Sequence, residues 1–585
     1  MTGRAAADAD RAEGDRIEDR RREDHRGADG PDRAWWKESV VYQVYPQSFA
    51  DSDGDGVGDL RGILDRVDYL DDLGVDVVWL NPVYDSPQVD NGYDIADYRS
   101  IRAAYGTMAD WDALLEAVHD RGMGLVMDLV VNHTSDRHEW FRRSRDPDSP
   151  YHDWYHWVEG DPDEPPNNWT SGFGGSAWSY DEAVGKWYLH LFDETQPDLN
   201  WRNSDVRDAV FDVMNWWFER GIDGFRMDVI NLISKPEGYP DGDPEEGWVG
   251  VDQFTEGPRI HEYLREMDER VLSNHDALTV GECIGVDPGE ADRYAADGLG
   301  MTINFDHVTL DFDEEAGWWA VREFPLTELK AAVGRWQTEP QRAWPAVYLG
   351  NHDQPRMVSR FGDDGRFREA SAKLLATLVL TLGGTPFLFQ GDEVGMTNYP
   401  WESLEEIDDA DATNRVREAV ETGEIEGFEE VRDLIRYRCR DNARTPMQWS
   451  DDPHAGFTDS DADPWLPVNP NYPEVNVEAA RADPDSVWHH YRTLIDLRHE
   501  HDVLVYGDYT PVLPDHERVW AYERTLGDER AFVALNWSPE PTTVELPGRV
   551  CSDGATSVAT NYPDRTDGVP ERLDLDPYEA RVWVE

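Results

Sequence analysis

The sequence predicts an α/β fold: a closed (β/α)8 TIM barrel with an inserted domain after the third strand and a C-terminal all-β sandwich domain. Eight short apolar runs recur along the chain, at 40–45, 75–80, 125–131, 224–228, 278–282, 301–305, 346–349 and 386–390. Helical patterns such as 111–121 and 206–220 fill the intervals. Because strand–helix alternation of this kind is typical of a parallel sheet, eight units over this length indicate a closed barrel.

The regular alternation is interrupted once after the third run. Residues 134–203 are rich in Trp, Pro, Gly and Asp, and the segment is too long for an ordinary connection between a strand and a helix. We therefore expect it to form the inserted domain, with the barrel built from 34–133 and 204–504. A second, acidic insertion at about 401–440 follows the eighth run and has a helical pattern.

The two ends of the chain differ from the barrel. Short alternating strands recur at 518–523, 531–536, 542–545 and 579–584, so residues 505–585 are expected to form the C-terminal β domain. Residues 1–33 form a charged tail without the apolar region of a secretion signal. No run approaches the ~18 to 20 apolar residues of a membrane span. We expect a cytoplasmic protein with no membrane partner, either a monomer or a homo-oligomer.

The charge is extreme for a chain with this much apolar patterning. The 585 residues include 122 acidic and 54 basic side chains, a net charge of −68, and 25 Trp. Only five of the basic residues are lysines. An acidic surface poor in lysine suits a high-salt cytoplasm, where self-repulsion is screened, so we expect a halophilic, haloarchaeal-like protein. The charge argues against nucleic acid as a partner. The three cysteines lie far apart without metal-ligand spacing.

Three acidic residues follow strand-like runs: Asp228 in GFRMDVI, Glu282 in LTVGEC and Asp353 in VYLGNHD. In a parallel barrel, such residues reach the same rim. Cleavage of a glycosidic bond passes through a positively charged, oxocarbenium-like sugar and needs carboxylates on both sides of it. Any one of these acids could simply cap a following helix. Three together, accompanied by Arg226, His133 and His352, favour a catalytic site.

With these motifs, the chain resembles glycoside hydrolase family 13, the α-amylase family, and within it the oligo-1,6-glucosidase and α-glucosidase branch. The resemblance extends from about Trp35 to the end of the chain. It rests on motifs that occur in the family's order: DLVVNH (128–133), QPDLNW (196–201), GFRMDVI, the Glu282 strand, NHDQPR (351–356), QGDE (390–393) and ARTPMQW (443–449).

The resemblance implies a retaining mechanism. Asp228 would be the nucleophile, Glu282 the general acid and then the base, and Asp353 the residue that stabilises the distorted transition state. The two principal carboxyl groups should then be ~5 to 5.5 Å apart. Arg226 would keep the nucleophile anionic. His133 and His352 would donate hydrogen bonds to sugar hydroxyls beside the scissile bond.

The run DNGYD supplies two further residues of the expected pocket. By resemblance, Tyr93 stacks on the glucose ring, while Asp90 pairs with Arg444 of ARTPMQW around the 4-hydroxyl. These residues close the bottom of a dead-end pocket, which admits only a chain end. The expected reaction is therefore removal of the terminal, non-reducing glucose from short oligosaccharides.

The linkage and the acceptor remain open at this stage. Val229 follows the nucleophile, and in this branch a valine favours α-1,6 bonds. Sucrose isomerases share the valine but carry an R-L-D-R-D loop that is absent near 318–329. A glucosyl-transferring or isomerising enzyme is therefore the alternative to a hydrolase. A non-catalytic transporter subunit is a more remote one, since it would need a membrane helix and commonly lacks the three acids.

One metal site is expected in the loop after the first strand. Asp51, Asp53, Asp55 and Asp59 alternate with small residues, and hard cations prefer such oxygen-rich patterns. The twelfth position of the loop is Gly62 rather than Glu, so it is not an EF-hand. By resemblance the loop binds structural Ca²⁺, or Mg²⁺ in some members, through these four carboxylates and the Val57 carbonyl. In so acidic a chain, a solvated surface loop is the alternative.

Overall fold

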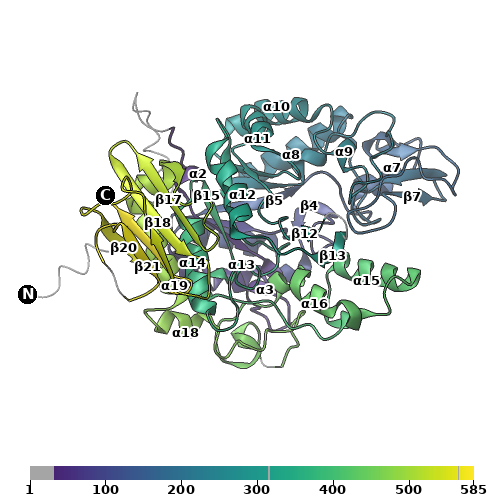
Figure 1. The fold of residues 1–585 in the computed structure, drawn as a ribbon. Helices are drawn as coiled ribbons and strands as arrows, with labels where there is room; N and C mark the ends of the chain where they lie inside the picture. The colour runs from purple at the N-terminus through teal and green to yellow at the C-terminus, as the bar shows by residue number, and fades with distance from the viewer. Residues whose placement is uncertain (1–31, 314–316, 460, 564–565) are drawn as a thin grey trace, which may run out of the picture.

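The computed structural model describes residues 32–313, 317–459, 461–563 and 566–585. The predicted tail at 1–33 thus lies almost wholly outside the described residues. At the centre of the molecule is a closed barrel of eight parallel strands (Figure 1). In chain order the strands are β1 (Val41–Val44), β2 (Val77–Leu80), β5 (Gly124–Val130), β9 (Gly224–Asp228), β10 (Leu278–Glu282), β11 (Met301–Ile303), β14 (Trp344–Val347) and β15 (Thr385–Phe389).

The barrel confirms the fold class predicted from the eight apolar runs. Its strand order is β1-β15-β14-β11-β10-β9-β5-β2, so each strand pairs with its neighbours in sequence order and β1 closes the ring on β15. The seventh strand differs from its prediction, because β14 ends at Val347 rather than at residue 349. Asp353 consequently lies in the loop after β14 and not at a strand end.

Helices cover the outside of the barrel, which is why its strands are buried on both faces. The main ones are α5 (Val67–Leu73), α6 (Met108–His119), α8 (Ser204–Arg220), α10 (Ile260–Arg270), α11 (Pro288–Ala296), α12 (Leu326–Thr338), α14 (Arg368–Thr381) and α19 (Val487–Glu500). Local signals set their ends. The α6 helix starts in a capping box of Thr107 and Asp110, and α8 ends at Gly221, whose φ of 108° favours glycine.

Two insertions lie on the side of the barrel away from the C-terminus (Figure 1). The segment predicted as the inserted domain contains α7 (Glu139–Ser144) and a three-stranded antiparallel sheet of β6 (Trp157–Val158), β8 (Lys186–Leu189) and β7 (Trp178–Asp181). The second insertion contains α15 (Ala410–Thr422) and α16 (Phe428–Arg438), as its pattern predicted, and leads into the short helix α17 (Asp441–Arg444).

The C-terminal region is all-β, as predicted. A five-stranded sheet has the order β16-β17-β18-β22-β20, with bounds Asp508–Pro511, Val519–Leu526, Glu529–Asn536, Ala580–Val584 and Thr556–Thr560. A two-stranded sheet pairs β19 (Thr542–Glu545) with β21 (Arg572–Leu575). Val519 and Trp583 of the first sheet and Val544 and Leu573 of the second share one buried cluster. The two sheets therefore pack face to face.

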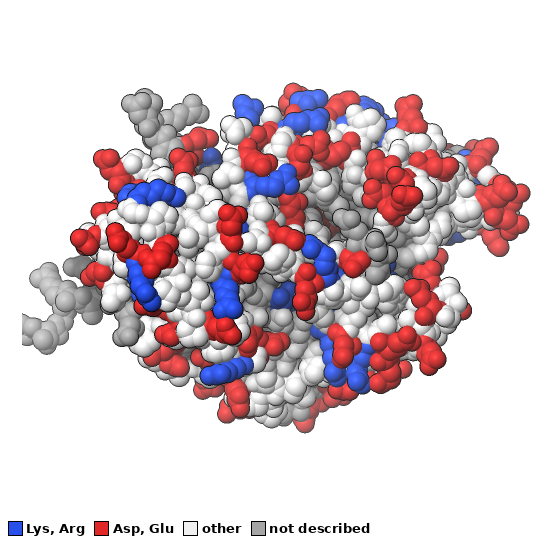
Figure 2. Space-filling model, in the orientation of Figure 1, with Lys and Arg blue, Asp and Glu red and all other residues white. Residues whose placement is uncertain are grey.

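Two surface properties bear on the sequence predictions. Asp and Glu are spread over the whole face shown in Figure 2, with fewer Lys and Arg among them. Within the described ranges, no helix has the length and apolar character needed to cross a bilayer.

Candidate active site

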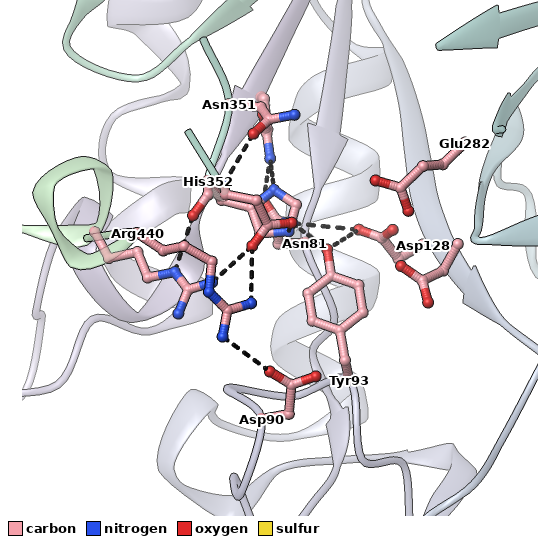
Figure 3. A network of polar contacts seen from close by, with 12 residues as sticks. Asn81, Asp90, Tyr93, Asp128, Glu282, Asn351, His352 and Arg440 are labelled. Carbon is pink, nitrogen blue, oxygen red and sulfur yellow. Dashed lines mark hydrogen bonds and ion pairs between the residues drawn. The ribbon is translucent and has the colours of Figure 1, made fainter. Parts of the chain in front are cut away.

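The structure gathers the predicted acids at one rim of the barrel. Asp228 is the last residue of β9 and Glu282 the last residue of β10, an adjacent strand. Both side chains are buried, with 9% and 8% of their surface exposed. The loop after β14 brings Asp353 and His352 to the same site, where they form part of a network of polar contacts (Figure 3).

Arg226 lies at the centre of the acids. Its Nη1 atom is 2.7 Å from Asp228 Oδ1 and 2.7 Å from Asp128 Oδ1, and its Nη2 atom is 2.8 Å from Glu282 Oε2. The sequence predicted the contact with Asp228. It missed the other two, although Asp128 opens the DLVVNH motif and could have been found there. Burial lowers the pKa of Arg226, but the carboxylates outweigh it and hold that pKa well above its usual range.

Opposing effects act on the pKa of Asp228, the predicted nucleophile. Burial raises the pKa of Asp228 well above its usual range, with repulsion from Glu282 and Asp128 acting the same way and Arg226 opposing them. One guanidinium contacts both Asp228 and Glu282, so a single buried cation offsets the repulsion between the two acids. Two buried carboxyls that contact one cation are an arrangement suited to cleavage of a glycosidic bond.

Val229 has an unusual backbone conformation. Its φ of 35° and ψ of 44° lie in the left-handed region, which a β-branched residue seldom adopts. The conformation points the Val229 N–H at Glu282 Oε2, 3.1 Å away. The predicted specificity residue is thus also a backbone donor to the predicted general acid, and the strain is located at the catalytic rim.

Asp353 is held by three cationic or potentially cationic groups. Arg444 Nη2 is 2.7 Å and Arg440 Nη1 3.3 Å from its Oδ1 atom, and His352 Nε2 is 3.0 Å from its Oδ2 atom. Burial raises the pKa of Asp353, but His352 and the two arginines outweigh it and hold the pKa well below its usual range. Asp353 is therefore ionised at neutral pH, as a group that stabilises a positively charged sugar must be.

Two of the predicted sugar-binding residues, Asp90 and Tyr93, belong to this network (Figure 3). The Tyr93 ring stacks on the His352 ring, with centroids 5.3 Å apart. Asp90 Oδ2 accepts a hydrogen bond from Gln196 Nε2 at 3.1 Å, and the same Gln196 nitrogen is 3.2 Å from His133 Nε2. Burial lowers the pKa of His133 to about 4, so this ring is neutral at neutral pH and can donate from one nitrogen only. Gln196 belongs to QPDLNW but had no predicted role.

No ion pair joins Asp90 to Arg444 among the described residues, although Arg440 and Arg444 both oppose the rise in the pKa of Asp90 that burial causes. Among the ion pairs of the described residues, the partner of Asp90 is Arg440, with Nη2 3.6 Å from Oδ1, whereas Arg444 contacts Asp353 and donates to the His352 carbonyl at 2.9 Å. Arg440 immediately precedes α17 and Arg444 ends it. Residues four apart share a helix face, so both arginines enter the site. The spacing inside CRDNAR was the signal that could have found Arg440.

The two insertions meet over the site. The guanidinium of Arg440, from the second insertion, lies 5.1 Å from the Phe173 ring of the inserted domain. The Phe173 ring is 5.6 Å from that of Phe192, which in turn is 5.2 Å from His133. Arg415 of α15 donates to the Gly172 carbonyl at 2.8 Å. These contacts restrict the approach to the acids.

The predicted metal loop brings together three of its carboxylates. One oxygen each of Asp51, Asp53 and Asp59 lies within 4.8 Å of the others. Burial and the neighbouring acids Asp55, Asp59 and Asp51 raise the pKa of Asp53, an effect that a bound cation would reverse. This donor set fits a hard divalent cation. Asp55, also predicted as a ligand, lies outside the group; its Oδ1 atom accepts the Val57 N–H at 2.9 Å.

The chain is similar to known glycoside-processing enzymes over almost its whole length. The chain is 50% identical over 561 residues to the oligo-1,6-glucosidase of Parageobacillus thermoglucosidasius. This alignment covers 94% of the chain and 99% of the glucosidase. Two crystal structures each cover 94% of this chain and 100% of their own. The trehalose-6-phosphate hydrolase of Bacillus licheniformis has a TM-score of 0.89 at 44% identity, and the isomaltulose synthase of Klebsiella sp. LX3 has 0.90 at 42%.

The family assignment rests on a match to a family model as well as on these relatives. Residues 43–507 match the model of the alpha amylase catalytic domain. That range includes all eight barrel strands except the first two residues of β1, both insertions, and each predicted catalytic acid. The chain therefore belongs to the α-amylase family of glycoside hydrolases.

Proposed function

We propose that this protein is a retaining, exo-acting α-glucosidase that releases terminal glucose from short α-glucosides. The observation that carries the proposal is the shared guanidinium of Arg226, which contacts both Asp228 and Glu282 at the rim. A retaining glycosidase needs two such carboxyls, one as nucleophile and one as acid. The 50% identity with an oligo-1,6-glucosidase over nearly the whole chain supports the same reaction.

In the first step, Asp228 attacks the anomeric carbon while Glu282 protonates the departing glycosidic oxygen. The reaction requires a protonated Glu282 and an ionised Asp228 when substrate is bound. A covalent glucosyl–Asp228 ester forms, and the aglycone leaves. In the second step, Glu282 removes a proton from water, which attacks the ester, releases glucose with its configuration retained, and restores Asp228.

The remaining residues act on the sugar. Ionised Asp353 would stabilise positive charge on the ring, and His352 beside it would bind a ring hydroxyl. Asp90 would accept from the 4-hydroxyl of the terminal glucose, with Arg440 in place of Arg444 as its partner. Neutral His133, oriented by Gln196, would donate to a hydroxyl next to the scissile bond. A pocket ended by Asp90 and Arg440 accepts only the end of a chain.

Hydrolysis is favoured over isomerisation or transfer. The identity with the isomaltulose synthase is 42%, against 50% with the oligo-1,6-glucosidase, and the R-L-D-R-D loop is absent. We propose a preference for α-1,6 over α-1,4 bonds on the basis of Val229.

A substrate panel tests the proposed function. Maltose, isomaltose, sucrose, trehalose and starch are incubated with the protein in high salt, and products are followed by NMR to read the anomer first formed. We expect α-glucose from the short substrates and slow action on starch. Rapid internal cleavage of starch, β-glucose as first product, or sucrose isomers as the main product would each contradict the proposal.

We also propose that the loop formed by Asp51, Asp53 and Asp59 binds Ca²⁺ as a structural ion, with Mg²⁺ as the alternative cation. Bound there, the ion would offset two of the three negative charges and fix the loop after β1. Chelation should lower the unfolding midpoint, and added Ca²⁺ should restore it more fully than Mg²⁺ does. A midpoint unaffected by chelator in wild type, and equal in wild type and Asp53→Asn, would favour a solvated loop.

We propose a cytoplasmic protein adapted to high salt, supported by the net charge of −68 and the five lysines among 54 basic residues.

A further inference from the structure

Asp94 is a buried carboxylate close to the sugar-binding residues that the reaction above does not use. It is fully buried, and it lies between the short antiparallel strands β3 (Tyr84–Asp85) and β4 (Asp97–Ile101). Asp94 makes no ion pair within 4.0 Å among the residues that the structure describes. Burial raises its pKa to about 6, with Ser86 and the Val89 N–H opposing, so it is ionised at pH 7.5.

The hydrogen-bond partners of Asp94 all belong to one loop. We define the floor loop as residues 86–94, since it carries Asp90 and Tyr93. Asp94 Oδ1 accepts from the Ser86 hydroxyl at 2.7 Å and from the Asp90 N–H at 3.3 Å, and Oδ2 accepts from the Val89 N–H at 3.0 Å. The Ser86 hydroxyl in turn accepts the Gln88 N–H at 2.9 Å.

The floor loop needs such support because its backbone is strained. Gln88 and Asn91 have φ values of 68° and 49°, and Gly92 has 104°. Two non-glycine residues in the left-handed region persist only where the surroundings hold them there. Ser86 accepts the N–H of Gln88 itself, and Asp94 accepts those of Val89 and Asp90, which follow it.

We infer that Asp94 is a positioning residue for the sugar-binding carboxylate Asp90. The ionised carboxylate accepts from the backbone of Val89 and Asp90 and so fixes where the Asp90 side chain projects. That side chain then meets Gln196 at 3.1 Å and Arg440 at 3.6 Å. A charged acceptor makes stronger hydrogen bonds than a neutral one, which explains a carboxylate rather than an amide at this buried position. The inference rests on the proposed role of Asp90 in binding the terminal glucose.

Asp94→Asn tests this role. The amide has one acceptor oxygen, so its NH2 group faces one of the loop's donors. At pH 7.5, well above the pKa of Asp94, we expect kcat/KM for 4-nitrophenyl α-glucoside to fall by about tenfold or more, with most of the loss in KM, and the inhibition constant of glucose to rise in parallel.

A double-mutant cycle separates positioning from general destabilisation. If Asp94 acts through Asp90, Asp94→Asn should change kcat/KM by less than about twofold in the Asp90→Asn background. Asp97→Asn is the matched control: Asp97 also accepts from a backbone N–H, that of Arg99, and a serine hydroxyl, that of Ser100, in the same hairpin, but it is exposed. It should leave KM and the glucose inhibition constant unchanged.

Ser86→Ala is the second variant, in case Asp94→Asn fails to fold. It retains the carboxylate but removes one contact to it and the support of Gln88, so a smaller loss in the same direction is expected. Unchanged KM and glucose inhibition in the folded variants, or equal losses with and without Asp90, would overturn the inference. A wild-type protein without α-glucosidase activity would instead overturn the proposed function.

Discussion

Arg226 and Glu282 form an ion pair of 2.8 Å at the rim of the barrel. The same guanidinium contacts Asp228 at 2.7 Å, so one buried cation serves both carboxyls of the proposed reaction. A cation between two acids lowers the repulsion between them and favours their ionised forms. The contact therefore explains how a nucleophile and an acid can coexist in a buried site.

Asp228→Asn should abolish nearly all turnover while leaving the fold intact. The amide cannot form the glucosyl ester, but its oxygen can still accept the hydrogen bond from Arg226. Initial rates on 4-nitrophenyl α-glucoside and the thermal unfolding midpoint measure the two properties. Retention of even about a tenth of the wild-type rate would contradict the nucleophile assignment.

Glu282→Gln should separate two classes of substrate. Isomaltose and maltose have poor leaving groups that need protonation, so their turnover should be lost. A dinitrophenyl α-glucoside needs no proton on its leaving group, and its glucosyl-enzyme should form at a measurable rate. Burst kinetics on the activated substrate and steady-state rates on isomaltose give the comparison. Equal losses on both would argue against an acid role for Glu282.

How far the sequence predicted this site depends on whether a residue acts from a strand or through a distant partner. The eight strands and the clustering of Asp228 and Glu282 followed from local patterns, because apolar runs fix the barrel and the barrel fixes its rim. The partners of Arg440 did not follow from any local pattern. Its contacts with Asp90, Asp353 and Asp409 join three separate segments, and only the folded chain determines which of two nearby arginines meets which acid.

Arg440→Ala should weaken sugar binding and shift the acid limb of the pH profile. Removing the guanidinium takes a nearby cation from both Asp90 and Asp353, and the pKa of a carboxyl rises when its cation is lost. We expect KM to rise by about tenfold or more and the acid limb of kcat/KM to move to higher pH. Arg440→Lys should recover part of the loss.

Arg438→Ala is the control for Arg440. Arg438 comes from the same insertion, but its guanidinium donates to the backbone carbonyls of Asp311 and Ala320. It should leave KM and the pH profile unchanged. If Arg440→Ala has the KM and pH dependence of the wild type, Arg440 does not bind the sugar. Arg444 would then be the next residue to test as the partner of Asp90.

The surface charge predicts that stability depends on salt. At low ionic strength the acidic side chains in Figure 2 repel one another. At about 1 M salt the Debye length is roughly 3 Å, so this repulsion is screened. The unfolding midpoint should therefore rise steeply over a KCl series from millimolar to molar concentrations. A midpoint independent of KCl would contradict adaptation to high salt.

Val229 directly follows the proposed nucleophile, Asp228, and is the residue that we propose determines the preferred linkage. Its N–H reaches Glu282 and its side chain is 6% exposed beside the rim. Replacing Val229 by Thr or Ala changes the shape of the site by one or two groups, which is worth ~1 to 3 kcal/mol in discrimination. We expect the ratio of kcat/KM for isomaltose to that for maltose to fall. Both variants retain the N–H, so the Glu282 contact and the turnover of 4-nitrophenyl α-glucoside should persist. An unchanged ratio in both variants would place linkage specificity elsewhere in the pocket.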